Sequence, residues 1–508
     1  MRVALLPLLT IFLLPTTLSA QYYPWLKEQI FFGGKGNEYG HRLVVDDKTG
    51  DYFIVGSISG HNGFRDGYIA KFDANDNLIY DKKVGGQYHD EIYDAELTKE
   101  GELVYCGVSG GPFSHGEVTF PERYADYLVG KIDQRGHSAW QHRLGGTQQD
   151  IAYGVAATDF GGLIVTGSSW SKDIDAEGNN EEHELNNQWI SIINRNGRVL
   201  RYIGHGGKKN DWGRSVCRTR DNGYVLAGVT NSEDLDDSKY KHNGDVWLTK
   251  VNFAGAIQWS KVIKAPGEDL VYRIVANPFG LYYVVGSRVT KDKGKQFWLA
   301  KLDDRGNVLW EKLYGESGFE ELRGVCVLKD GGVAMVGFSK YRDIQTPGTK
   351  GRKDVWVLRT DPQGELIWKK SFGGPNDEIG VDIAEYKEGL LYVLCQKENH
   401  FNGKKESMGQ DFWLLKIEER PCKSAQPDIF SDIRDYREKA GVPIKFLNAS
   451  RMKDAKFYWD FGDGTSSTEK QPVKKYMKTG VYNVSLTITV NEGCRTKLYY
   501  PKPVIITR

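Results

Sequence analysis

The segment LIWKKSFGGPNDE (Leu366–Glu378) has a form that recurs along the chain: an aromatic-rich stretch, two glycines and then an acidic residue. KKVGGQYHDE (Lys82–Glu91) repeats it closely, and VIKAPGED (Val262–Asp269) is a more divergent copy. The acidic residue at the end marks one position in each repeat: Glu38, Asp90, Asp150, Asp211, Asp269, Glu320 and Glu378. A spacing of about 50–60 residues indicates a repeat architecture rather than an ordinary globular domain.

Each repeat contains four short segments with the composition of β-strands, separated by Gly, Asp or Asn turns. YGVAATD (Tyr153–Asp159) and GLIVTGSS (Gly162–Ser169) illustrate the first two, and DVWVLRTD (Asp354–Asp361) and GELIW (Gly364–Trp368) the last two. Such segments predict one antiparallel four-stranded sheet per repeat. Both faces of such a sheet are apolar, and a radial arrangement of seven sheets buries them. The sequence therefore predicts an all-β, seven-bladed β-propeller over residues 21–418.

The ends of the repeat region predict how the ring closes. The last repeat runs through DFWLLKIEE (Asp411–Glu419) into a polar segment without a fourth strand. The missing strand and its double glycine stand near the other end of the chain, in WLKEQIFFGG (Trp25–Gly34). We expect this N-terminal strand to close the last blade, which leaves no broken edge.

The repeats resemble two known kinds of propeller. DGGVAMVGFS (Asp330–Ser339) with DVWVLRTDPQG (Asp354–Gly364) is similar to the short bacterial repeats of the delta-60 type. LDDRGNVLW (Leu302–Trp310) resembles the tryptophan-docking turn of quinoprotein-like propellers. The resemblance covers roughly residues 25–418, and it implies the fold while saying little about activity.

The C-terminal segment has a different pattern. WDFGDGTSST (Trp459–Thr468), followed by KYMKTGVYNVSLTI (Lys475–Ile488), resembles the PKD domain, which implies an immunoglobulin-like β-sandwich. We expect this domain to span residues 427–508 after a linker at 419–426. Val481, Val484, Leu486 and Ile488 are expected to alternate along one of its strands. The acidic and glycine residues of the motif predict a tight structural turn, with a calcium or ligand loop as the alternative: Asp460, Gly462, Asp463 and Gly464.

The N-terminus and the net charge bear on location. Residues 1–20, MRVALLPLLTIFLLPTTLSA, have a basic start, an apolar run and a small-residue end, which predict a secretory signal peptide. No later stretch is apolar for the roughly 20 residues a bilayer requires, so no membrane span is expected. Lys and Arg total 68 against 67 Asp and Glu, which gives a net charge of +1 and no electrostatic basis for nucleic-acid binding. The chain is therefore expected to be secreted or extracytoplasmic.

Six cysteines in a chain of 508 residues do not form a disulfide framework. Four of them stand within apolar strand patterns and are expected to be small core residues: Cys106, Cys217, Cys326 and Cys395. Cys422 and Cys494 lie outside the repeats, and the sequence leaves open whether they form a disulfide.

The connections between the second and third strands are long and varied, and in a propeller they share one face with the blade-to-blade crossings. That face, around the central channel, is the expected functional site. The recurring acidic residues lie there as well. They could form a cation-binding ring, or each carboxylate could accept backbone N–H groups in its own crossing turn.

Aligning the first strands of the repeats places four charged residues in one column: Arg42, Asp94, Arg273 and Asp382. Alternating charges near the axis could hold a polar ligand through charge-assisted hydrogen bonds. The alternative is a structural ladder of ion pairs.

One residue earlier, the column reads His41, Tyr93, Tyr153, Arg214, Tyr272, Arg323 and Val381. Polysaccharide lyases built on propellers use His, Tyr and Arg side chains to neutralise a uronate and move a proton. An enzymatic site would therefore use His41, Arg42, Tyr93 and Tyr272. The alternative is that Tyr and Arg pack between blades.

DIDAEGNNEEHE (Asp173–Glu184) has the oxygen-ligand spacing of a calcium loop. Asp173, Asp175, Glu177 and Glu184 occupy its first, third, fifth and twelfth positions. Flanking helices are missing from the sequence pattern, so a solvated acidic loop is the alternative.

Three hypotheses about function follow. The first is a secreted or cell-surface bacterial protein that binds a protein or polysaccharide, with the PKD domain as spacer or second contact. Trp170, Tyr240 and Tyr341 are its candidates for sugar stacking. The second is a carbohydrate-active enzyme, a lyase or hydrolase, at the channel mouth. The third is a structural component of an envelope or secretion assembly.

Overall fold

A computed structural model of the chain describes residues 22–508 except for segments 34–35, 61–63, 111–112, 116–117, 121–124, 173–185, 236–243, 265–268, 316–317, 341–352, 401–407, 422–428, 432–435, 449–454, 491–493 and 501–502. It divides into two compact units, one spanning Trp25–Glu418 and the other containing Glu419–Arg508. No helix of the described segments is long and apolar enough to cross a membrane. The predicted signal peptide at 1–20, and residues 422–426 of the predicted linker, lie outside the described residues.

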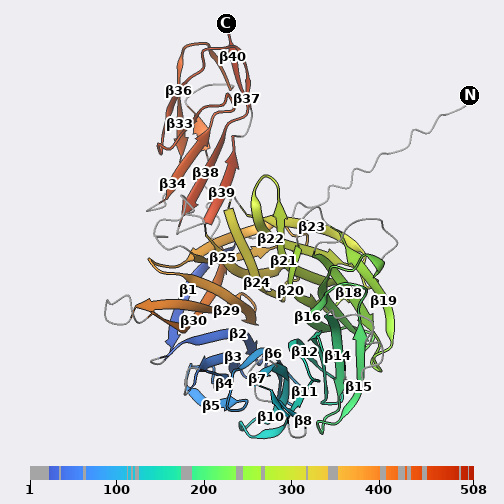
Figure 1. The fold of residues 1–508 in the computed structure, drawn as a ribbon. Coiled ribbons are helices and arrows are strands. Elements are labelled where there is room, and N and C mark those ends of the chain that lie inside the picture. The colour runs from blue at the N-terminus through green and yellow to red at the C-terminus, as the bar shows by residue number, and fades with distance from the viewer. Residues whose placement is uncertain are drawn as a thin grey trace, which may run out of the picture. The chain divides into compact units, whose positions relative to one another are not determined.

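The larger unit is built from β-sheets that follow one another around a common centre (Figure 1). The first sheet comprises β2 (Glu38–Val45), β3 (Tyr52–Ser59), β4 (Arg65–Phe72) and β5 (Leu78–Val84). The second comprises β6 (Asp90–Leu97), β7 (Leu103–Gly110), β10 (Ala125–Ile132) and β11 (Ser138–Leu144), and the hairpin of β8 (Phe113–His115) and β9 (Val118–Phe120) precedes β10. The third comprises β12 (Asp150–Ala157), β13 (Leu163–Ser169), β14 (Asn187–Ile193) and β15 (Val199–His205). The fourth comprises β16 (Asp211–Arg218), β17 (Tyr224–Thr230), β18 (Asp245–Val251) and β19 (Ile257–Ile263), with the short 3-10 helix η2 (Glu233–Leu235) after β17.

The next two repeats form one eight-stranded sheet. It comprises β20 (Asp269–Ala276), β21 (Tyr282–Thr290), β22 (Gly294–Leu302), β23 (Val308–Tyr314), β24 (Gly318–Val327), β25 (Val333–Ser339), β26 (Asp354–Thr360) and β27 (Leu366–Phe372). The two halves are joined because β22 begins early enough to pair in parallel with β24, Gly294 with Gly318 and Lys295 with Phe319. The sequence predicted two separate sheets here. Because the β21–β22 turn is short, β22 starts early enough to reach β24, and this parallel bridge joins the two sheets.

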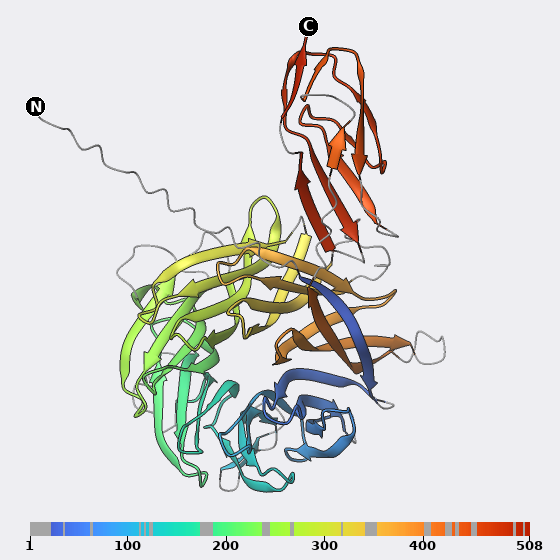
Figure 2. The same cartoon turned by 180° about the vertical axis from the view of Figure 1, so that it is seen from behind.

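The last sheet of this unit joins both ends of the repeat region. Its order is β1-β30-β29-β28, from β28 (Glu378–Lys387), β29 (Leu390–His400), β30 (Met408–Pro421) and β1 (Tyr22–Phe32). Figure 2 shows the N-terminal strand in blue beside strands coloured orange. Phe31 of β1 stacks on Trp413 of β30 with ring centroids 6.0 Å apart. The N-terminal strand thus pairs with the last strand of the repeats, as predicted, and no sheet of the described residues closes on itself.

Apolar side chains from neighbouring sheets form the core of the larger unit. Tyr127 and Val129 of the second sheet, for example, are buried with Val165 and Trp189 of the third. The same holds between the first and last sheets, where one cluster contains these residues: Leu43, Tyr52, Ile54, Ala70, Phe72, Val381, Tyr392, Leu394, Phe412 and Leu414. The arrangement is propeller-like, because each sheet buries its faces against its neighbours rather than against a second layer.

The Asp-x-x-Gly turns and the tryptophans that follow them connect adjacent sheets. In the β22–β23 turn, the Asp303 carboxylate accepts the backbone N–H groups of Arg305 at 3.0 Å and Asn307 at 2.7 Å. Gly306 of this turn has a φ of +76°, and an added Cβ would lie 2.6 Å from the ring of Trp259 in the preceding sheet. The tryptophan therefore docks on a turn that requires glycine.

The second unit is a separate set of small β-sheets. One contains β31 (Ile429–Ser431), β33 (Pro443–Asn448) and β36 (Val473–Lys475). Another contains β32 (Arg437–Lys439), β40 (Val504–Thr507) and β37 (Gly480–Tyr482). The third contains β35 (Ser466–Ser467), β34 (Lys456–Asp460), β38 (Ser485–Val490) and β39 (Cys494–Tyr499). Phe446, Trp459 and Leu486 are fully buried at its centre.

The predicted alternation in this unit is correct for three residues and wrong for the fourth. Val484, Leu486 and Ile488 are buried, whereas Val481 is 65% exposed. Val481 belongs to β37, the edge strand of a different sheet, so the core does not cover its side chain.

The acidic motif of the second unit forms a turn. Gly462 and Gly464 have φ angles of +75° and +83°. The Asp460 carboxylate accepts the Gly462 N–H at 3.0 Å, and the Asp463 carboxylate lies 2.7 Å from the Lys474 ammonium. Both carboxylates are engaged within the motif and its neighbouring strand.

Four cysteines of the larger unit are free thiols. Cys106 and Cys395 are buried, as expected of core residues, whereas Cys217 and Cys326 are partly exposed. The latter two lie on β16 and β24, the first strands of their repeats, and Cys217 packs against the edge of a hydrophobic core cluster. Cys422 lies outside the described residues, so the structure does not test whether it forms a disulfide with Cys494.

Candidate ligand-binding site

The first strand of each repeat has a β-bulge at the same position. Its pairing with the second strand slips by one residue between Gly40/Arg42, Ile92/Asp94, Ala152/Gly154, Gly213/Ser215, Val271/Arg273, Leu322/Gly324 and Gly380/Asp382. The skipped residues are those of the predicted His/Tyr/Arg column, and the residues after them form the predicted charged column. A bulge leaves one residue unpaired and redirects its side chain. The side chain of the skipped residue and that of the next residue can therefore both point toward the centre of the larger unit, although they are consecutive in the strand.

A glycine of the second strand faces most of these bulges. A Cβ added to Gly228 would lie 1.9 Å from the Trp212 carbonyl oxygen, and one added to Gly107 would lie 1.9 Å from that of Glu91. The recurring glycine in segments such as GLIVTGSS is thus required by the bulge opposite it. It lets the bulged backbone approach more closely than any side chain would allow.

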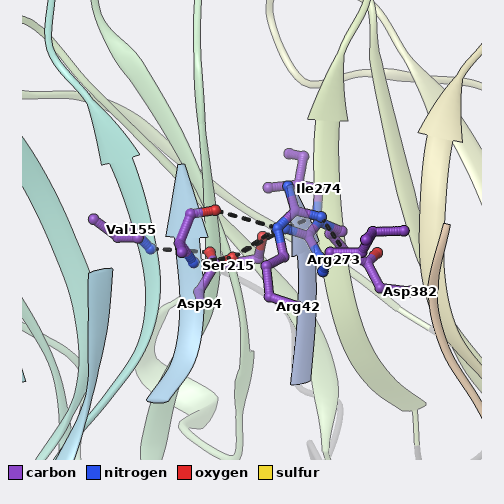
Figure 3. A network of polar contacts seen from close by, with 9 residues as sticks. Arg42, Asp94, Val155, Ser215, Arg273, Ile274 and Asp382 are labelled. Atoms are coloured by element: carbon purple, nitrogen blue, oxygen red, sulfur yellow. Dashed lines mark hydrogen bonds and ion pairs between the residues drawn. The ribbon is translucent and has the colours of Figure 1, made fainter. Parts of the chain in front are cut away.

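Arg42, Asp94, Arg273 and Asp382 meet in one group, which we call the axial cluster (Figure 3). The Arg42 guanidinium lies 2.6 Å from Asp382 and 3.1 Å from Asp94. The Arg273 guanidinium lies 3.1 Å from Asp94 and 3.4 Å from Asp382. These residues come from β2, β6, β20 and β28, whose sheets are not all neighbours, so they meet where the sheets converge.

The carboxylates of the axial cluster also hold backbone groups of adjacent first strands. Asp382 accepts the Leu43 N–H at 2.9 Å, and Asp94 accepts the Val155 N–H at 3.1 Å. Burial by itself lowers the pKa of the Arg42 guanidinium, but Asp382 and Asp94 outweigh it and raise that pKa. The opposite charges of the axial cluster thus connect several sheets.

The skipped residues form a second layer beside the axial cluster, which we call the belt: His41, Tyr93, Tyr153, Arg214, Tyr272 and Arg323. The His41 and Tyr93 rings contact edge to face at 5.1 Å, and Tyr93 stacks on Tyr153 at 5.5 Å. The Arg214 guanidinium lies over the Tyr153 ring, 4.3 Å from its centroid. All six belt side chains are half-buried, whereas Val381, at the seventh position, is buried.

Two carboxylates that the sequence analysis did not single out support the belt. Glu91 contacts Arg65, lies 3.3 Å from His41 and is 2.9 Å from His89. Burial on its own raises the pKa of Glu91, but His41 and Arg65 outweigh it and bring that pKa to about 2. Glu321 lies 2.8 Å from Lys295 and 3.0 Å from Arg323. The signal was present, since only in β6 and β24 of these first strands is the recurring acidic residue followed directly by a second one.

The geometry of the predicted catalytic set favours packing over proton transfer. Burial, followed by the neighbouring Glu91 carboxylate, raises the pKa of Tyr93 well above its ordinary value. Burial and Glu321 do the same for the pKa of Tyr272. Arg42 is held by two carboxylates of the axial cluster. A tyrosine with a raised pKa is a poor general base at neutral pH.

Arg214 differs from the other belt cations. Arg323 pairs with Glu321, and His41 lies beside Glu91. Among the described residues, Arg214 has no carboxylate partner and rests on the face of Tyr153. An arginine held on an aromatic ring with its charge uncompensated can form bidentate hydrogen bonds with a carboxylate or sulfate group.

Four of the recurring acidic residues cap the crossings between sheets, whereas Asp269 is paired with the Arg288 guanidinium. The Gly86, Gly146, Gly207 and Gly374 N–H groups donate to Asp90, Asp150, Asp211 and Glu378 at distances between 2.8 and 2.9 Å. Ser171 also donates to Asp150, at 2.8 Å. The geometry agrees with backbone capping, the second of the two predicted roles.

Three buried carboxylates of the larger unit predict a pH dependence of its stability. Burial raises the pKa of Asp150, Asp269 and Asp354 to about 6, and nearby Asp side chains add to it. A raised carboxyl pKa stabilises the fold at low pH, and that stability is lost as the pH rises through the folded-state pKa. We expect the melting temperature to rise by about 5 °C when the pH is lowered from 7.5 to 5.0.

One histidine reduces the expected rise in melting temperature, and a pair of variants tests its origin. Burial lowers the pKa of His205 to about 4, so this side chain acts in the opposite direction below pH 6.5. Asp150→Asn should flatten part of the rise in a thermal melt, whereas the exposed Asp47→Asn should not. A melting temperature that is constant or falls between pH 7.5 and 5.0 would contradict the assignment.

The predicted calcium residues Asp173, Asp175, Glu177 and Glu184 lie outside the described residues, as do Tyr240 and Tyr341. No group of three or more His, Cys, Asp or Glu side chains in the described segments has the geometry of a metal site. Trp170 is described and is partly exposed.

Comparison with known families matches residues 428–499 to the PKD domain. Collagenase ColA of Clostridium perfringens is 54% identical over 141 residues, which are 27% of this chain and 9% of that protein. The microbial collagenase of Vibrio alginolyticus is 39% identical over 59 residues, 11% of this chain and 7% of that protein. The chain thus spans less than a tenth of the length of these relatives.

Solved structures that are similar to the chain have low identity. A polysaccharide lyase described as a PL25 ulvan lyase has a TM-score of 0.48 and 11% identity over 77% of this chain and 98% of its own. YCF48 bound to D1 peptide has a TM-score of 0.44 and 10% identity over 80% of this chain and 99% of its own. A protein of unknown function from Dyadobacter fermentans has a TM-score of 0.43 and 11% identity over 78% of this chain and 99% of its own. Neither the identities nor the TM-scores support an inference about activity.

Proposed function

We propose that the chain is a secreted or cell-surface binding protein that recognises a protein or polysaccharide through the belt and the loops around it. The PKD match and the collagenases that share it support an extracellular location. In this proposal the PKD domain, residues 427–508, acts as a spacer or second contact after a linker at 419–426. A leader peptide at residues 1–20 would direct export.

We also propose that residues 21–418 form a closed seven-bladed propeller of the delta-60 or quinoprotein-like type. Pairing of β1 with β30, and the core shared by the first and last sheets, support it. The axial cluster then has a structural role at the centre of the ring. Both of its arginines face carboxylates, whereas the belt contains Arg214, which has no carboxylate partner among the described residues.

The observation that carries the binding proposal is the uncompensated charge of Arg214. The belt and the residues that support it contain four permanent cations and two carboxylates: Arg65, Arg214, Arg323, Lys295, Glu91 and Glu321. The surplus is positive, and half-buried tyrosine rings adjoin it. Such a surface suits a ligand that carries carboxylate or sulfate groups beside apolar ring faces.

Replacing Arg214 with alanine is expected to weaken binding of an acidic ligand about tenfold, because one charge-assisted pair is lost. The measurement is isothermal titration of the full chain with polygalacturonate, chondroitin sulfate, gelatin and neutral dextran. Arg198→Ala, in the exposed β14–β15 turn, is the matched control. Equal affinities of Arg214→Ala and the unsubstituted chain, or binding to dextran alone, would refute the role of Arg214.

We do not propose catalysis by His41, Arg42, Tyr93 and Tyr272, because the Arg42 guanidinium is held by Asp94 and Asp382 and the Tyr93 ring packs between His41 and Tyr153. Incubation with polygalacturonate and measurement of unsaturated products tests this choice directly. We expect no product absorbance. Product that disappears in Tyr93→Phe would reverse the choice in favour of a lyase.

A further inference from the structure

Four cations gather around two phenylalanine rings where β22 meets β24. The Lys340 and Lys295 ammonium groups lie 4.4 and 4.9 Å from the centroid of the Phe319 ring. Lys353 and Arg323 lie over Phe338, at 5.1 and 5.5 Å. The two rings stack at 6.1 Å, so the four cations form one patch, which we call the basic track: Lys295, Arg323, Lys340 and Lys353.

The basic track has far more positive than negative charge. Glu321 pairs with both Lys295 and Arg323. Within the described segments, Lys340 and Lys353 have no carboxylate partner, and both side chains reach solvent. Placing unneutralised cations this close together costs electrostatic energy unless an anion joins them.

The track is continuous with the belt. Arg323 belongs to both, and Glu321 connects it to Lys295. Burial raises the pKa of Glu321, but Arg323 and Lys295 outweigh it and hold that pKa below its ordinary value. A chain-like ligand with one acidic group at the belt would meet further cations if it continued outward along β24.

The backbone at this junction is already occupied. Lys295 pairs with Phe319 across the parallel bridge, and the Lys340 N–H donates to the Phe319 carbonyl at 3.0 Å. Ser339 and Asp354 are paired between β25 and β26. An extended peptide would therefore find no free strand edge here to add to, and recognition must use the side-chain cations.

We infer that the basic track is a second subsite for an acidic polysaccharide, whose repeated carboxylate or sulfate groups extend from the belt across the β22–β24 junction. This inference rests on the proposed binding function and names its ligand class. Lys340 and Lys353 supply the outer contacts, and Arg214 supplies the inner one.

The test uses the full chain with long and short ligands. Lys340→Ala/Lys353→Ala should bind polygalacturonate or chondroitin sulfate about tenfold more weakly and with a smaller salt dependence. It should bind digalacturonate as tightly as the unsubstituted chain, since a disaccharide reaches only the belt. Lys48→Ala/Arg305→Ala, which removes two exposed cations from turns at the other end of the sheets, is the matched control and should change neither affinity. Melting temperatures of both double variants verify that the fold is retained.

Comparison with Arg214→Ala separates the two proposals. If only Arg214→Ala binds the polymers more weakly, the basic track is not a second subsite and the proposal for the belt stands. If only Lys340→Ala/Lys353→Ala binds the polymers more weakly, the basic track is a binding site and the proposed role of Arg214 in the belt is wrong. Poly-L-glutamate distinguishes an acidic protein: stronger binding of it than of either polysaccharide, with the same loss in the lysine variant, would overturn the polysaccharide assignment. Binding of both polymers identifies the uronate carboxylates that they share, and binding of chondroitin sulfate without polygalacturonate identifies its sulfate groups.

Discussion

Replacing Asp382 with alanine is expected to lower the free energy of unfolding of the larger unit by about 3–5 kcal/mol. Asp382 is fully buried and accepts hydrogen bonds from Arg42 at 2.6 Å and from the Leu43 N–H at 2.9 Å. Its loss would leave two guanidinium groups sharing Asp94 and one backbone N–H without an acceptor. Denaturant unfolding of the variant, followed by tryptophan fluorescence, measures the effect.

Two controls separate this effect from the loss of any carboxylate. Asp47→Ala, which removes a side chain that is 70% exposed, should cost less than about 1 kcal/mol. Asp382→Asn combined with Arg273→Gln should cost less than the sum of the single changes, because charge is removed in balance. A loss below 1 kcal/mol for Asp382→Ala would show that the cluster does not fix the sheets.

Replacing Gly228 with alanine is expected to cost at least about 3 kcal/mol or to prevent folding. The added methyl group would lie 1.9 Å from the Trp212 carbonyl oxygen, and the contact partner is backbone that cannot rotate away. Relief would require β16 and β17 to separate at the bulge. The free energy of unfolding and the yield of folded protein both report the outcome.

Gly86→Ala is the matched control for this substitution. No heavy atom outside its chain neighbours lies within 4 Å of a Cβ added at Gly86. This variant should therefore fold with nearly unchanged stability. Equal stability of Gly228→Ala and Gly86→Ala would mean that the bulge does not require a glycine opposite it.

Local patterns predicted much of the larger unit. The Asp-x-x-Gly turn around Asp303 forms through hydrogen bonds within five residues, so the sequence displays it directly. The cap of Asp150 on the Gly146 N–H is equally local, at a separation of four residues. Pairing of the N-terminal strand β1 with the last repeat was also readable, because that repeat lacked a strand and the other end of the chain supplied it.

The candidate site was predicted only in part. Column alignment placed Arg42, Asp94, Arg273 and Asp382 at one level, and they do meet. Glu91 and Glu321, which engage the belt cations, were missed, although each stands two residues before a belt residue and therefore on the same face of an alternating strand.

The sequence by itself determined which segments become strands and turns, because hydrogen bonds between close neighbours and the alternation of apolar residues act within a few positions. Tertiary structure alone decided where the bulges fall and which charges remain without a partner. A bulge depends on the register between two strands, and the neutralisation of a charge depends on residues hundreds of positions apart, such as Arg42 and Asp382. The contacts of Arg214, Lys340 and Lys353 with aromatic rings of neighbouring strands therefore arise only once the sheets are packed.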